Sequence, residues 1–116
     1  VFEVNPYLRI IEPEISVIGR KVVAKFKLEQ VTSNEVYRIS LFAHSHIDVS
    51  NKLNIVNRTE ELNRSITDGE AFELSINLED YTSTLVPGKS YYFRIGAQSH
   101  GSETKYNYSA SVQLDI

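Results

Sequence analysis

The sequence predicts an all-β domain of seven strands, in which two antiparallel sheets pack face to face. Three observations predict this fold class. Short segments alternate apolar and polar residues with a period of two, as half-buried strands do. Turn-forming Gly, Pro, Asn and Asp residues separate these segments, and no long helical pattern lies between them. Because each predicted sheet has one apolar face, a second sheet is needed to cover it.

The composition is that of one globular domain. The chain has 116 residues, of which 41% are hydrophobic and 23% charged. The net charge of −3, with acids and bases interspersed, argues against a nucleic-acid partner. The absence of Cys excludes disulfides and thiolate metal sites. No apolar run reaches the ~18 residues of a membrane-spanning helix, so we expect membrane attachment only through an anchor outside these residues.

The first strand is expected at residues 7–18, after a linker at residues 1–6 that precedes a single domain at 7–116. Pro13 interrupts this strand and cannot donate a ladder hydrogen bond, so the strand should lie at a sheet edge or be broken there. Gly19-Arg20 predicts a hairpin into the second strand.

The next two strands are predicted from strict alternation. Residues 21–30 place four apolar side chains inward, namely Val22, Ala24, Phe26 and Leu28. Residues 36–47 also alternate, with an inward set of Tyr37, Ile39, Leu41 and Ala43. The outward set of that strand is Arg38, Ser40, Phe42, His44 and His46.

The segment 48–68 has a weaker pattern. It favours a short strand near 53–56 and a helical turn near 59–63, where Thr59 is suited to cap and two glutamates to follow. Residues 71–78 alternate again. The last strand is predicted at 105–116, with six apolar or aromatic residues on one face: Tyr106, Tyr108, Ala110, Val112, Leu114 and Ile116.

The stretch 85–97 combines a turn with a central strand. Pro87-Gly88 marks a tight turn, because Pro fixes one backbone angle and Gly accepts a positive φ. After it, four side chains alternate toward the core: Tyr91, Phe93, Ile95 and Ala97. Tyr92 and Arg94 point the other way.

The residues Leu85, Pro87, Gly88, Tyr91 and Ala97 resemble the signature of the fibronectin type III family. This resemblance implies an immunoglobulin-like sandwich with strands A, B, C, C′, E, F and G. It also implies that Tyr91 is a tyrosine corner, whose hydroxyl bonds to backbone upstream, and that Leu85 closes the core. The family's Trp on strand B is missing, and Phe26 is the best substitute.

A narrower resemblance rests on four short motifs. Residues 5–10 (NPYLRI), 26–30 (FKLEQ), 92–97 (YFRIGA) and 106–109 (YNYS) look like a family of Bacteroidetes lipoproteins of unknown function, encoded beside polysaccharide-utilisation systems. The resemblance implies a cell-surface, outer-membrane or periplasmic location, and glycans or another outer-membrane protein as partners. No catalytic or binding residues are established for that family.

The candidate binding residues are Phe42, His44, His46, Tyr92 and Arg94, which should share the outer face of two neighbouring strands. Aromatic rings stack on sugar faces, so this set could form a platform for a glycan or a protein. The alternative is that Phe42 and Tyr92 stabilise the sheet or pack beneath a covering loop.

Other chemistry is not expected. If the strands containing His46 and His100 are antiparallel neighbours, His100 should lie about eight residues farther along the sheet than His46. That is roughly 26 Å at ~3.3 Å per residue, so the three histidines cannot share one metal ion. No nucleophile elbow or phosphate loop is present. We therefore expect a domain that is not an enzyme and takes no cofactor or metal. It would serve as a spacer, docking or glycan-capture unit, with a carbohydrate-binding module and a protein-adhesion domain as alternatives.

Overall fold

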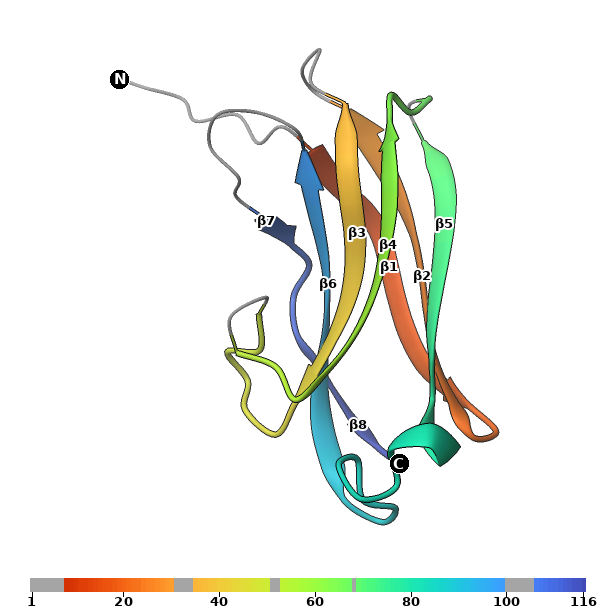
Figure 1. Cartoon of the computed structure of the whole chain (residues 1–116), viewed down its shortest axis with the longest axis vertical. Helices are drawn as coiled ribbons and strands as arrows, with labels where there is room; N and C mark the ends of the chain where they lie inside the picture. The colour runs from red at the N-terminus through yellow and green to blue at the C-terminus, as the bar shows by residue number, and fades with distance from the viewer. Residues whose placement is uncertain (1–7, 31–34, 51–52, 68, 100–105) are drawn as a thin grey trace.

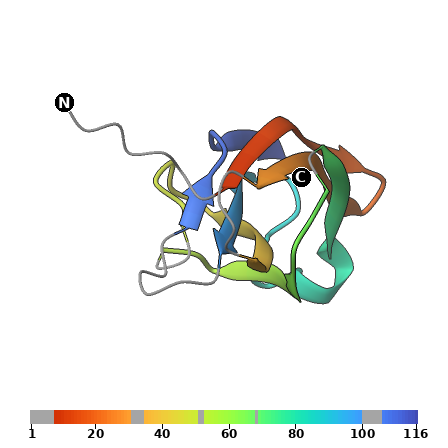
Figure 2. The ribbon, with the colours of Figure 1, turned by 90° about the horizontal axis from the view of Figure 1, so that it is seen from above.

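The computed structural model is a sandwich of two antiparallel sheets, as predicted (Figure 1). It describes residues 8–30, 35–50, 53–67, 69–99 and 106–116. The predicted linker at residues 1–6 lies outside this part of the chain. Viewed from above, the two sheets form layers that face one another across the core (Figure 2).

Eight strands and one short 3-10 helix make up the described structure. One sheet has three strands in the order β1-β2-β5, and the other has β4-β3-β6 followed by β7 and β8, which both pair with β6. In the fibronectin lettering this is A-B-E facing C′-C-F-G, the arrangement that the resemblance implies. The elements are β1 (Leu8–Ile18), β2 (Lys21–Gln30), β3 (Val36–His44), β4 (Val56–Arg64), β5 (Glu70–Asn77), η1 (Leu78–Tyr81), β6 (Ser90–Ser99), β7 (Tyr106–Tyr108) and β8 (Val112–Asp115).

Strand β1 lies at a sheet edge and is also irregular at Pro13, so the prediction for this strand is confirmed. The pairing with β2 shifts between Ile11 and Glu14, and Glu12 has a φ of 51°. These features define a β-bulge. The bulge accommodates Pro13, which has no backbone N–H to donate to the neighbouring strand. Gly19 has a φ of 61° at the β1–β2 turn, as the predicted hairpin needs.

Three predictions for β3 and for the segment that contains β4 are wrong. A bulge between Val36 and Arg38 makes Val36, which is fully buried, the first inward residue of β3, whereas Tyr37 is only half-buried. Residues 59–63 are not helical, because they form the middle of β4, and the short strand expected at 53–56 begins only at Val56. Hydrogen bonding to the free edge of β3 outweighs the local capping preference.

The predicted last strand is divided in two by residues 109–111. Tyr108 in β7 lies opposite Gly96, on the outer face of the sheet, whereas Leu114 in β8 lies opposite Tyr91 and faces the core. The expectation that Tyr108 and Leu114 share one face is therefore wrong. Ser109 causes the change, because its Oγ accepts a hydrogen bond from the Ile95 N–H (3.1 Å) in the gap between the two strands.

The core fills the space between the sheets. Phe26, the expected substitute for the missing Trp, is 2% exposed and stacks on Phe72 with ring centroids 5.9 Å apart. Most inward residues of the alternating strands are buried as predicted. The buried cluster comprises Ile15, Val22, Ala24, Phe26, Leu28, Val36, Ile39, Leu41, Ala43, Val56, Leu74, Ile76, Leu78, Leu85, Tyr91, Phe93, Ile95 and Ala97.

The turn before β6 has the predicted geometry. The Lys89 N–H donates to the Val86 carbonyl (3.2 Å), and Gly88 has a φ of 86° at the third position, as a type II turn requires. Tyr91 is 6% exposed, and its hydroxyl accepts a hydrogen bond from the Val86 N–H at 2.9 Å. This bond is the tyrosine corner, and the fully buried Leu85 lies beside it.

An ion pair joins the two sheets near the β4–β5 connection. The Arg64 guanidinium donates two hydrogen bonds to the Glu70 carboxylate, at 3.1 and 2.5 Å. This bidentate contact lowers the pKa of Glu70, with help from the Thr67 N–H.

Among the described residues, no helix is long and apolar enough to cross a membrane.

We predict that Tyr91→Phe lowers the free energy of unfolding by about 1 kcal/mol, because the Val86 N–H loses its partner. Chemical denaturation measures this change. Tyr92→Phe, which removes a hydroxyl from the neighbouring half-buried ring, is the control and should leave the midpoint unchanged. An unchanged midpoint for Tyr91→Phe would contradict the tyrosine-corner assignment.

We predict that Glu70→Gln destabilises the domain at neutral pH but not in acid. Since the folded-state pKa of Glu70 lies below its ordinary value of 4.5, its carboxylate contributes stability above that pH. The contribution is lost as pH falls through the lowered pKa. Denaturation of both proteins across this pH range should show the stability difference shrinking, and Glu73→Gln on the same strand serves as control. A difference that is constant with pH would contradict this role.

Candidate functional site

The five predicted binding residues do lie near one another at one end of the five-stranded sheet. Phe42 is paired with Arg94, and His44 with Tyr92, across the β3–β6 ladder. His46 follows β3 directly, and its backbone N–H donates to the Nδ1 of His44 at 3.0 Å. The predicted register is therefore present for Phe42, His44, Tyr92 and Arg94. The strand predicted at 36–47 ends at His44, so the expectation that His46 lies on its outer face is wrong.

Phe42 cannot be reached, because other segments cover it. Its side chain is only 3% exposed. Tyr108 packs against it with ring centroids 6.2 Å apart, and the fully buried Val49 belongs to the β3–β4 loop that folds back over the same face. Phe42, Val49, Arg94 and Tyr108 form a small second core outside the sandwich, which we call the outer cluster.

Arg94 holds the outer cluster together. Its Nε donates to the Ser109 carbonyl at 2.7 Å, and its Nη1 donates to the Val49 carbonyl at 3.4 Å. Its guanidinium carbon lies 4.7 Å from the centroid of the Tyr108 ring, a cation–π contact. One side chain of β6 thus ties the β3–β4 loop and the β7–β8 link to the sheet. Because these contacts occupy its guanidinium, the role of Arg94 is structural.

Of the predicted site residues, His46 is exposed and His44 and Tyr92 are partly exposed, and Gln113, which was not predicted, extends the last two into a strip across three strands. Tyr92 is half-buried, with His44 on one side of it in β3 and Gln113 on the other in β8. We call these three residues the Tyr92 strip. It offers one aromatic face flanked by an imidazole and an amide, a combination that suits the apolar face and the hydroxyls of a sugar ring.

The β3–β4 loop adds apolar surface beyond the strip. Ile47, Leu53 and Ile55 are 54%, 39% and 41% exposed, respectively. The loop is held by its own polar groups, among them a pair of backbone hydrogen bonds between Ser50 and Leu53 (2.9 and 3.2 Å). The β3–β4 loop that carries these side chains runs at the lower left of Figure 1, beside the five-stranded sheet.

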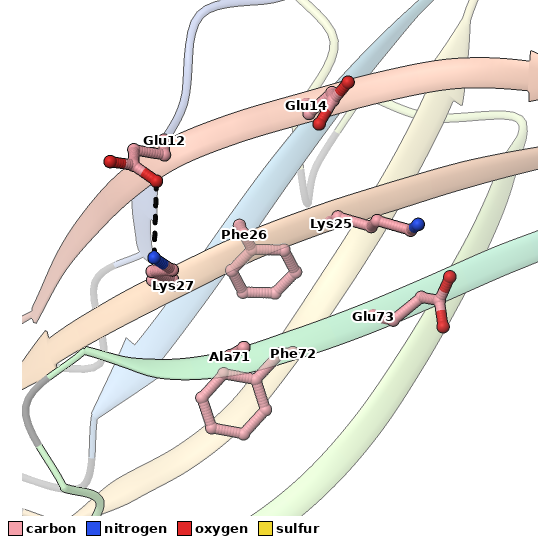
Figure 3. A pocket seen from close by; sticks show the side chains of 8 residues that line it. All are labelled: Glu12, Glu14, Lys25, Phe26, Lys27, Ala71, Phe72 and Glu73. Atoms are coloured by element: carbon pink, nitrogen blue, oxygen red, sulfur yellow. Dashed lines mark ion pairs between the residues drawn. The ribbon is translucent and has the colours of Figure 1, made fainter.

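A separate hollow of about 370 Å³ lies over the three-stranded sheet (Figure 3). Glu12, at the β1 bulge, pairs with Lys27 at 3.4 Å. Lys25 stands between Glu14 and Glu73 in the strand register. The charges of this face thus alternate across the strands and compensate one another, which is typical of a solvated sheet face.

Metal-ligating side chains do not gather in the described part of the chain, where no three His, Asp or Glu residues are placed to hold an ion. The Nδ1 of His46 accepts a hydrogen bond from the Asp48 N–H at 3.1 Å. His100, the third histidine of the sequence, lies outside the described residues.

Sequence reasoning did not identify two features of this surface. The role of Val49 depends on the folding back of a loop, for which the local pattern carries no signal. The outward position of Tyr108 depends on the break at Ser109; the Ser109-Ala110-Ser111 run, low in β propensity, was the one available sign of it.

The model of a known protein family matches most of the chain. The family model for DUF3823_C, described as a domain of unknown function, matches residues 8–113. A comparison with curated protein sequences finds no match.

Solved structures share the fold. A candidate carbohydrate binding protein from Bacteroides uniformis is 28% identical, with a TM-score of 0.87 over 96% of this chain and 58% of that one. A DUF3823 family protein from Parabacteroides merdae is 22% identical, with a TM-score of 0.78 over 95% of this chain and 53% of that one. A third, from Bacteroides ovatus, is 18% identical, with a TM-score of 0.77. The chain therefore spans a little over half the length of these proteins.

We predict that Arg94→Ala lowers the free energy of unfolding by about 2 kcal/mol, as expected for hydrogen bonds from a charged donor. It should also raise hydrogen exchange of the Val49 amide, because the β3–β4 loop loses its anchor. Arg58→Ala, at an exposed arginine in β4, is the matched control and should change stability by less than about 0.5 kcal/mol. Equal effects of the two substitutions would contradict the anchoring role of Arg94.

Proposed function

Because the chain belongs to the DUF3823_C family, we propose that it is a non-catalytic accessory domain of a longer bacterial surface protein and that it captures glycans. The single observation that carries the proposal is the Tyr92 strip, a partly exposed aromatic ring beside polar side chains. The similarity to a candidate carbohydrate binding protein from Bacteroides uniformis supports it.

The rigidity of the supporting sheet suits this role. Tyr92 follows the tyrosine corner directly, and its two neighbours in the strip belong to strands that pair with β6 on either side. A side chain held on paired strands keeps its position better than one on a loop, and less conformational entropy is lost on binding. Such a site would hold a polysaccharide chain near the cell without altering it.

The location of the parent protein is part of the proposal. We take it to be a lipoprotein at the cell surface, in the outer membrane or in the periplasm, attached through an anchor outside these residues. In that setting the domain would keep glycans close to proteins that degrade or import them.

A second candidate function is docking to an outer-membrane protein. It is favoured by the exposed aliphatic side chains Ile47, Leu53 and Ile55, which all belong to the β3–β4 loop. Exposed apolar residues grouped in this way are typical of interaction surfaces.

We predict that Tyr92→Ala weakens glycan binding by about tenfold or more, which is the loss of one stacking contact of roughly 1.4 kcal/mol. A glycan array identifies a neutral ligand, and calorimetry measures its affinity. Ile18→Ala, at the last residue of β1, which is 60% exposed, is the control and should bind normally.

Two results would contradict the proposal. Hydrolysis of a glycan by the purified domain would exclude a purely accessory role. A domain that binds no glycan, but retains an outer-membrane protein in a pull-down that Ile47→Ser abolishes, would favour docking instead.

A further inference from the structure

A second cleft lies at the opposite side of the sandwich, where the edge strands of the two sheets meet. Strands β4 and β5 are the outermost strands of their sheets on this side, and they contact each other. Near the end of β5, where η1 begins, the space between them opens into a cleft of about 240 Å³. The residues of interest in its lining are Lys21, Arg58, Asn77, Asp80 and Tyr81. We call it the edge cleft.

The cations of the edge cleft have no partner in the part of the chain that the structure describes. The exposed side chains of Arg58 and Lys21 make no hydrogen bond or ion pair there. By contrast, Arg64 is paired with Glu70, and Arg94 is bound to two carbonyl groups. With Asp80, the cleft carries a net charge of about +1, although the chain as a whole carries −3.

The remaining lining residues offer the contacts that a sugar needs. Tyr81 is 37% exposed and provides an aromatic ring. The Oδ1 of Asn77 caps η1 by accepting from the Glu79 N–H at 3.2 Å, and this bond fixes the amide so that its Nδ2 remains a donor. Asp80 provides acceptor oxygens for hydroxyl groups.

We propose that the edge cleft binds an acidic sugar, a hexuronic acid unit of a polysaccharide. The planar guanidinium of Arg58 matches a carboxylate with two parallel hydrogen bonds, and Lys21 adds a second positive charge. Tyr81 packs on the ring, while Asn77 and Asp80 bond to its hydroxyls. The cleft is separate from the Tyr92 strip, so it binds whether or not the strip takes a glycan, and it gives the domain a preference for anionic polysaccharides.

The test is calorimetry with oligogalacturonate, and with neutral galacto-oligosaccharide of equal length as the comparison. We predict that the acidic oligosaccharide binds about tenfold or more tightly than the neutral one, and that added salt weakens its binding. Arg58→Gln and Tyr81→Ala should each weaken binding by about tenfold, with the melting temperature unchanged because both side chains are exposed.

The matched control is Arg20→Gln. Arg20 is exposed and lies beside η1, since its carbonyl accepts the Leu78 N–H at 2.9 Å, but it does not line the cleft. It should bind normally although its charge change equals that of Arg58→Gln. Four outcomes would overturn the proposal: no binding at millimolar concentration, equal binding of the neutral sugar, an equal loss in Arg20→Gln, or a loss in Tyr92→Ala instead. If acetate at the same concentration displaced the acidic oligosaccharide, the cleft would be an anion site without preference for a sugar. That result would also overturn the proposal.

Discussion

The pairing of β6 with three other strands is the constraint on which the rest of the structure depends. On the inner side of β6, Phe93 and Ile95 are fully buried between the sheets. On its outer side, Arg94 anchors both the β3–β4 loop and the β7–β8 link. One strand therefore determines the core and also which part of the outer face is closed. Tyr92, two residues before Arg94 on the same strand, stays partly exposed.

The sequence predicts this fold well wherever the strands are regular. Residues 21–30 alternate without interruption, so the period of two identifies the buried face of β2 correctly. The turn at Pro87-Gly88 is predicted from local chemistry alone, since Gly88 needs a positive φ. Errors arise where one residue, or a short run of residues, is left unpaired between regular parts of a strand. Tyr37 and Tyr108 are misplaced for this reason, because a bulge or a break reverses the sides of the strand without changing composition.

The candidate site was partly predictable, for a related reason. That His44 and Tyr92 are neighbours follows from the strand register, which local patterns convey. The burial of Phe42 depends on a loop folding back through Val49, a tertiary event that no local pattern records. The edge cleft could not be predicted, because residues 59–63, directly after Arg58, favour a helical turn by their own propensity. Only pairing with β3 makes this segment an edge strand.

The Tyr92 strip and the edge cleft are two surfaces of the sandwich that each combine an aromatic ring with polar groups. We propose that this domain binds carbohydrate with its own side chains and leaves it intact. A heteronuclear NMR titration of the whole domain with polysaccharide fragments tests it most directly. We predict amide shifts centred on Tyr92 and Gln113, or on Arg58 and Tyr81 for acidic fragments, and fragments of unchanged length. Absence of shifts at saturating fragment, or shortening of the fragments by the domain, would contradict the claim.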